Sequence, residues 1–195
     1  MLKKLIKVAY DNKSLRGYLL PLIKESHVHL PKGKWVDIET PSLSDKQLKE
    51  LWEMYTHSYR DIGLSVSGVQ QMKSKYCCSF LIDVDRDPDP DAFILYKKTP
   101  FGKKISLLGT DGQKAAKRQV ITKMLSLVNS SGYYLEASHG ISAILERSGV
   151  TPIDDPELVS TVLKKDIRWL GGGKYERLLK GVGFVEKSLY GNPRV

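Results

Sequence analysis

Apolar residues three and four positions apart predict the helices of this chain. The clearest helix begins at Ser44, which forms a capping box with Gln47, and ends before Gly63. Its apolar positions share one face: Leu48, Leu51, Trp52, Tyr55, Tyr59 and Ile62. A long helix is predicted from Gln113 to about Val128. Its buried side would carry Ala116, Val120, Ile121, Met124, Leu125 and Val128.

Shorter helices are predicted over residues 67–75, from Ser138 to Arg147 and from Pro156 to about Lys165. Ser138 is expected to cap the second of them. Asp155 is expected to cap the third, because a proline after an N-cap suits the first helical position. Residues 14–25 also show a helical period, which Pro21 interrupts, whereas residues 1–10 fit either a strand or a short helix.

Alternating or short continuous apolar runs predict strands at residues 34–39, 78–84, 92–97, 104–108 and 133–137. The gaps within the middle three are short and rich in turn residues, which favours antiparallel hairpins. Residues 175–190 predict two more strands that turn at residues 181–183, and residues 171–173 (three glycines) predict a flexible break. Alternate aspartates over residues 83–91 predict an acidic hairpin turn, because a calcium loop would need a glycine and a closing glutamate that are missing there.

These elements predict an α/β protein of the α+β kind, with a mixed, mostly antiparallel central sheet flanked by helices. The 195 residues fit one domain, with ordinary contents of hydrophobic (41%) and charged (27%) residues. We expect residues 35–195 to form this domain, with an extended C-terminal element at 151–195. The segment 1–34 is expected to pack on it.

The chain is basic, with a formal net charge of +9, and its lysines and arginines are spread along the sequence. This charge favours polyanionic partners, either nucleic acid or a cofactor with several phosphates, although a solvated basic surface explains it as well. No apolar run has the length of a membrane span, and Lys7 interrupts the apolar stretch that a secretion signal would need. The only cysteines, Cys77 and Cys78, are adjacent and form no disulfide framework. We therefore expect a cytoplasmic protein without a membrane partner.

The order of elements over residues 35–150 resembles that of the GNAT (N-acetyltransferase) superfamily. Residues 138–150, SHGISAILERSGV, are similar to the family segment that begins with Asn and continues as a helix. Residues 111–117, DGQKAAK, are the counterpart of the family's glycine-containing cofactor loop. The resemblance implies a divergent member that binds acetyl-coenzyme A, or a related acyl-coenzyme A, where two neighbouring central strands splay apart.

The resemblance also implies a set of cofactor-binding residues: Leu107, Leu108, Gly109, Gly112, Gln113, Lys114, Ala115, Ala116 and Lys117. The physical argument concerns the start of the long helix, whose first amides lack intrahelical partners and whose dipole attracts a diphosphate. Lys114 and Lys117 are otherwise unfavourable at a helix N-terminus, so their presence fits an anion site. A solvated basic face of a surface helix is the alternative.

Four side chains are candidates for the chemistry of acyl transfer: Glu136, His139, Ser142 and Glu146. Histidine is suited to accept a proton near neutral pH, and Glu146 or Ser142 would replace the family's acidic tyrosine. Each of the four is also an ordinary residue for a cap or a helix surface. In the C-terminal element, Tyr175, Arg177 and Lys187 are candidates to touch substrate.

Three functions remain open from the sequence. The first is an N-acyltransferase that acts on the amine of a small molecule, a protein or a modified base. The second is a nucleic-acid-binding or nucleic-acid-modifying protein on a similar scaffold, which the charge favours. The third is a scaffold that kept the fold and lost the chemistry. Fold alone does not decide between them.

Overall fold

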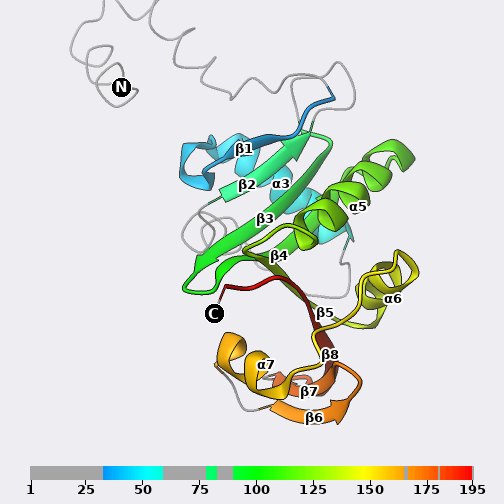
Figure 1. The fold of residues 1–195 in the computed structure, drawn as a ribbon. Helices are drawn as coiled ribbons and strands as arrows, with labels where there is room; N and C mark the ends of the chain where they lie inside the picture. The colour runs from blue at the N-terminus through cyan, green and yellow to red at the C-terminus, as the bar shows by residue number, and fades with distance from the viewer. Residues whose placement is uncertain (1–32, 59–77, 83–89, 165–166, 180, 195) are drawn as a thin grey trace, which may run out of the picture.

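A central sheet of eight strands organises the chain in a computed structural model (Figure 1). The structure describes residues 33–58, 78–82, 90–164, 167–179 and 181–194. The strands lie in the order β1-β2-β3-β4-β5-β8-β7-β6. Their bounds are β1 Val36–Ile38, β2 Cys78–Ile82, β3 Ala92–Thr99, β4 Gly102–Thr110, β5 Tyr133–Ala137, β6 Ile167–Gly171, β7 Lys174–Leu179 and β8 Gly183–Gly191. Every pair of neighbours is antiparallel except β4 and β5, which are parallel. The predicted fold class is confirmed.

Helices cover both faces of this sheet. They are α3 (Asp45–Ser58), α5 (Lys114–Val128), α6 (His139–Arg147) and α7 (Pro156–Leu163), with a 3₁₀ turn, η2, at Thr40–Ser42. Helices α5 and α6 pack on one face through a cluster that includes Val120, Met124 and Leu145. Helix α3 covers the other face of β3 and β4 through Leu48 and Leu51. On that same face, α7 covers β5, β7 and β8.

Local capping signals place two of these helices as predicted. At the start of α3, the Gln47 amide donates to Ser44 Oγ (3.2 Å), and the Ser44 amide donates to Gln47 Oε1 (3.2 Å). At the start of α7, Asp155 Oδ1 accepts from the amides of Glu157 (3.0 Å) and Leu158 (3.1 Å). Each cap satisfies amides that the helix itself leaves without partners.

Three local predictions need correction. Ser138 occupies the N-cap position of α6, but its side chain makes no capping hydrogen bond. Helix α7 ends at Leu163 rather than near Lys165, because Lys164 turns into the left-handed region (φ 48°). The three glycines at 171–173 form no flexible break. All have positive φ and make the tight turn of a hairpin between β7 and β6, a strand that the sequence analysis missed.

Several predictions concern residues outside the described part of the chain. These are the segment 1–34 apart from its last two residues, the end of the first long helix after Ser58, the helix at 67–75 and most of the acidic turn at 83–91. The C-terminal residues are described almost throughout, and they extend the same sheet with α7 and the strands β6 to β8. None of the described helices combines the length and apolarity that a membrane span needs.

Candidate functional site

The parallel strands β4 and β5 separate in the middle of the sheet. They pair at only three positions, Lys103 with Tyr133, Lys104 with Tyr134 and Ile105 with Leu135. Strand β4 then continues to Thr110 and β5 to Ala137 without further pairing between them, and Figure 1 shows the two strands diverging.

A bulge lies where β4 and β5 diverge. Leu107 faces Leu95 of β3 and Ile105 faces Tyr96, so Ser106 is the extra residue of β4. The Ser106 hydroxyl donates to the carbonyl of Lys104 (3.2 Å), which closes the bulge locally. A bulge bends its strand and increases the twist, so it helps to turn β4 away from β5.

An apolar cavity of about 290 Å³ lies beside this opening, on the face that α5 and α6 cover. We call it the apolar cavity. Its walls are Leu108, Gly109, Thr110, Lys117, Val120, Ile121, Met124, Ile141 and Ile144. Only Lys117 among these carries a charge. The cavity therefore joins the end of β4, the first half of α5 and one side of α6.

The turn before α5 is held by its own side chains. Thr110 Oγ1 accepts from the Gly112 amide (3.2 Å), and Asp111 Oδ1 accepts from the Gln113 amide (3.0 Å). Gly112 has a φ of 105°, and a side chain there would meet nothing, so the backbone is open to solvent. Because Asp111 occupies the Gln113 amide, the amides left for an anion are those of the first turn after it.

The predicted cofactor residues divide into three groups. Leu108, Gly109 and Lys117 line the apolar cavity. Gly112, Gln113, Lys114 and Ala115 form the exposed turn and first residues of α5. The side chains of Leu107 and Ala116 face elsewhere. Leu107 packs with the α3 cluster on the opposite face, and Ala116 is fully buried in the core, so any contact with a ligand would come from their backbones.

Gly109 has a packing role besides its place in the cavity wall. A Cβ at this position would lie 2.2 Å from the ring of Phe93, the neighbour that it faces on β3. Phe93 is fully buried, so its ring has no room to move aside. The glycine therefore allows an aromatic ring to fill the core directly beneath the end of β4.

Three of the four catalytic candidates lie together on α6. His139, Ser142 and Glu146 line a small cavity of about 70 Å³, which Lys187 of β8 also lines. The spacing of three and four residues puts them on one side of the helix. Ile141 and Ile144, which line the apolar cavity, are on another side. The structure thus brings these three candidates together, but not into the apolar cavity.

Tyr190 holds Glu146 in this small cavity. The buried hydroxyl of Tyr190 donates to Glu146 Oε1 at 2.9 Å. Burial raises the pKa of Tyr190, and the nearby Glu146 carboxylate raises it further, while hydroxyls close by act in the opposite direction. Tyr190 is therefore a neutral donor at physiological pH, a role that the sequence analysis did not assign to it.

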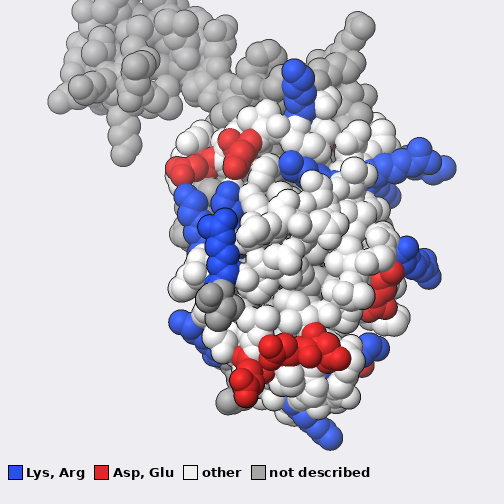
Figure 2. Space-filling view, in the orientation of Figure 1, with Lys and Arg blue, Asp and Glu red and all other residues white. Residues whose placement is uncertain are grey.

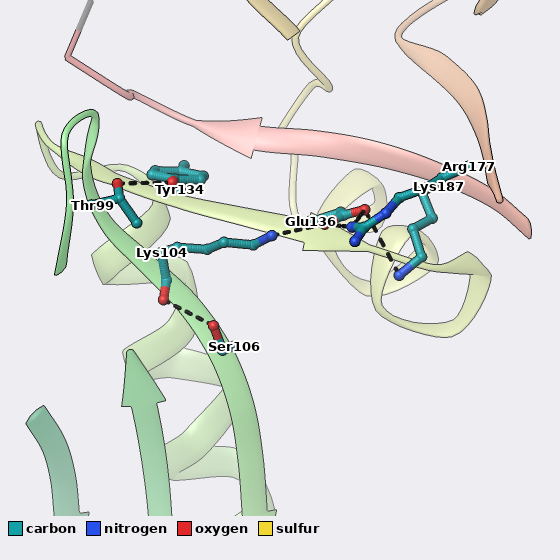
Figure 3. Close-up of polar contacts among 7 residues, drawn as sticks. All are labelled: Thr99, Lys104, Ser106, Tyr134, Glu136, Arg177 and Lys187. Carbon is teal, nitrogen blue, oxygen red and sulfur yellow. Dashed lines mark hydrogen bonds and ion pairs between the residues drawn. The ribbon is translucent and has the colours of Figure 1, made fainter. Parts of the chain in front are cut away.

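The fourth candidate, Glu136, is the centre of a buried ion cluster (Figure 3). Its side chain is only 4% exposed, and its carboxylate contacts Lys104 Nζ at 2.8 Å, the Arg177 guanidinium, and Lys187 Nζ at 4.0 Å. Burial alone would raise the pKa of Glu136, but the charges of Lys104, Arg177 and Lys187 outweigh it and lower the pKa to about 2. A carboxylate this acidic is a weak proton acceptor, so the structure argues against Glu136 as the general base.

A second cavity, of about 430 Å³, lies on the opposite face of the sheet, between the β3–β4 turn and the end of α7. We call it the cationic cavity. Its walls are Lys97, Thr99, Pro100, Phe101, Lys104, Tyr134, Val162, Leu163, Lys164 and Arg177. In the view of Figure 2, basic side chains gather beside the β3–β4 hairpin and project beside α5. Sequence reasoning found Arg177 as a substrate contact but missed the rest, because β3, β5 and α7 meet there only in the folded chain.

Among the described residues, no group of three or more His, Cys, Asp or Glu side chains is placed to hold a metal ion. No protein-family model matches the chain, and no curated protein matches it in sequence. Its shape is similar to that of several solved structures, whose names follow.

An acyl-CoA N-acyltransferase from Pseudomonas aeruginosa is 12% identical, with a TM-score of 0.49, over 83% of this chain and 99% of that one. ElaA from Escherichia coli is 13% identical, with a TM-score of 0.48, over 83% and 99% of the two chains. The ribosomal-protein-S18-alanine N-acetyltransferase from Escherichia coli is 13% identical, with a TM-score of 0.45, over 82% and 94%. These values are too low to carry a function from those proteins to this chain.

Proposed function

We propose that this protein is an acyl-coenzyme A-dependent N-acyltransferase of the GNAT type. The observation that supports the proposal is the loss of pairing between β4 and β5 beyond Ile105 and Leu135, beside the apolar cavity. A sheet gains stability from each paired backbone group, so an interrupted central pair needs another explanation. An extended ligand with amide groups would satisfy the exposed strand edges.

The residues present are compatible with acyl-coenzyme A. The diphosphate would be held by first-turn amides of α5 and by Lys114 and Lys117, which are exposed there. Each cation near that turn adds a favourable charge contact. The mainly apolar walls of the cavity, such as Val120 and Ile144, would enclose the less polar arm of the coenzyme. When bound, the coenzyme supplies the acyl group as a thioester, which reacts with an amine.

The chain itself must then bind the amine in its neutral form, accept its proton and protonate the departing thiolate. We assign proton transfer to His139 and Glu146, with Ser142 as a hydrogen-bonding partner, because these side chains share one cavity. Tyr190 fixes the position of Glu146. This cavity is separate from the apolar cavity, so a chain of water molecules or a movement of α6 would have to connect them.

The binding step can be tested by calorimetric titration with acetyl-coenzyme A. Charge reversal in Lys114→Glu or Lys117→Glu should weaken binding roughly tenfold or more, because each loses a charge-assisted contact of about 1.5–3 kcal/mol. Lys49→Glu is the matched control. Lys49 is an exposed residue of α3, on the other face, and its reversal changes the net charge equally.

The result has clear alternatives. No binding at millimolar acetyl-coenzyme A would contradict the proposal, and equal losses in all three variants would contradict the place given to the diphosphate. Release of free coenzyme A thiol in the presence of a panel of amines then tests turnover. Binding without turnover on any amine would mark a scaffold that lost its chemistry, and would also contradict the roles of His139 and Glu146.

A further inference from the structure

We propose that the cationic cavity binds a compact oxyanion, a carboxylate or a phosphate, carried by the acceptor whose amine is acylated. The proposal rests on the proposed function for its link to catalysis, but the anion site itself can be tested alone. It concerns Lys104 and Arg177 at the base of the cavity and Lys164 at its edge.

Positive charge is in excess at the base of this cavity. Lys104, Arg177 and Lys187 all contact the single carboxylate of Glu136 (Figure 3). Three cations and one carboxylate leave an excess of two positive charges in this cluster. The side chains of Lys104 and Arg177 are only 25% and 15% exposed, so water compensates these charges incompletely. A bound anion would supply the missing counter-charge.

The hydrogen-bonding groups of the cluster are also not all used. Arg177 Nε is buried and has no hydrogen-bond partner among the described residues. A buried donor left without a partner costs free energy, about 1–3 kcal/mol, and is unusual in a native structure. Guanidinium groups present several N–H donors in one plane, which match the two oxygens of a carboxylate or phosphate.

The remaining walls also suit a polar ligand. Lys97 and Lys164 add positive charge, and the walls contain no acidic residue within the described part of the chain. The hydroxyls of Thr99 and Tyr134 are hydrogen-bonded to each other at 2.9 Å. Lys164 Nζ lies 5.5 Å from the centre of the Phe101 ring, which keeps this exposed side chain beside the cavity. The volume of about 430 Å³ fits a small molecule and is too small for a folded partner.

The cavity also lies in the right place for an acceptor. Lys104 faces the cationic cavity, whereas Leu108, further along the same strand, lines the apolar cavity on the other face. The two strands part just after Lys104, between Ile105 and Leu135. An acceptor held by its oxyanion at Lys104 would therefore have its amine near the opening, where an acyl group could reach it from the opposite face.

The test uses the full-length chain and two probes, inorganic phosphate and acetate, followed by amide NMR. We expect shifts at Phe101, Tyr134 and Lys164 that saturate with one of the two probes, and the tighter probe identifies the class of oxyanion. Lys164→Gln and Lys104→Gln should each weaken that binding roughly tenfold, the cost of one charge-assisted contact. Lys49→Gln on α3 is the matched control and should bind as the unchanged protein does.

The design separates this inference from the proposed function. Phosphate bound at the start of α5 would shift Lys114 and Ala115 instead, and Lys114→Glu would abolish it. If only those shifts appear, or if Lys104→Gln and Lys164→Gln both bind normally, the inference is overturned whatever acetyl-coenzyme A does. Lys164 is exposed, so its variant should keep the fold, and a urea unfolding curve checks this. Saturable binding at the cationic cavity supports the anion site even if coenzyme A does not bind.

Discussion

Replacement of Glu136 by Gln should destabilise the protein strongly and in a pH-dependent way. The 4%-exposed carboxylate is the single counter-charge that Lys104, Arg177 and Lys187 share. Removing one partner of a buried ion cluster leaves uncompensated charge and typically costs about 3–5 kcal/mol. The glutamine amide keeps a hydrogen-bond acceptor for these donors but removes the negative charge.

The pH dependence follows from the pKa of Glu136, which falls from 4.5 in the unfolded reference to about 2 in the fold. A lowered pKa gives stability that is present above pH 4.5 and is lost as the pH falls toward 2. A difference of roughly 2.5 units corresponds to about 3 kcal/mol in total. Between about pH 7 and about pH 3.5, roughly 1.5 kcal/mol of it should disappear.

Urea unfolding of the two proteins at several pH values measures this effect. The gap between the unchanged protein and Glu136→Gln should be largest near neutrality and should narrow below about pH 4.5. Glu186→Gln is the matched control, because Glu186 forms an exposed ion pair with Lys174, and such pairs contribute about 0–1 kcal/mol. A loss no larger than the control's, or a gap that stays constant with pH, would refute the account of this cluster.

Two further changes test the fold around the site. Gly109→Ala places a Cβ 2.2 Å from the Phe93 ring and should lower the free energy of unfolding by about 1–3 kcal/mol in urea titrations; unchanged stability would contradict the tight packing beneath β4. Asp155→Ala removes the cap of α7 and should cost about 1 kcal/mol, measured the same way; Asp155→Asn, which keeps an acceptor, should cost less, and equal losses would exclude a capping role.

Sequence reasoning succeeded where short-range signals decide the structure. The capping box of Ser44 and Gln47 and the cap at Asp155 are local hydrogen bonds between residues close in the chain. The hairpin of β3 and β4 follows from a short turn. The period of apolar residues in α5 correctly placed Ala116, Val120 and Met124 in the core.

It failed where a residue's role depends on distant partners. Glu136 was a reasonable catalytic candidate as one acidic residue in a strand, but its three cations come from β4, β7 and β8. Tyr134 and Glu136, two residues apart on β5, share a face of the sheet, and this alternation was the one available sign that they lie near each other. No local pattern indicated that Lys104 would face them.

The opening between β4 and β5 belongs to neither group. The resemblance in element order predicted it, and the pairing of the strands agrees, with only three paired positions and a bulge at Ser106. The bulge itself has no sequence signature, because Ser106 is an ordinary strand residue in an alternating run. The helix start with Lys114 and Lys117 was visible in sequence, whereas the apolar cavity beside it was not.

A crystal structure of the protein grown with acetyl-coenzyme A tests the central claim most directly. The account predicts the diphosphate against the amides of Lys114 to Ala116, and the pantetheine arm along β4 between its bulge and Gly109, with the thioester close to the point where Ile105 and Leu135 part. A coenzyme bound anywhere else on the chain, or a β4–β5 pair that closes and leaves no room for it, would contradict the account.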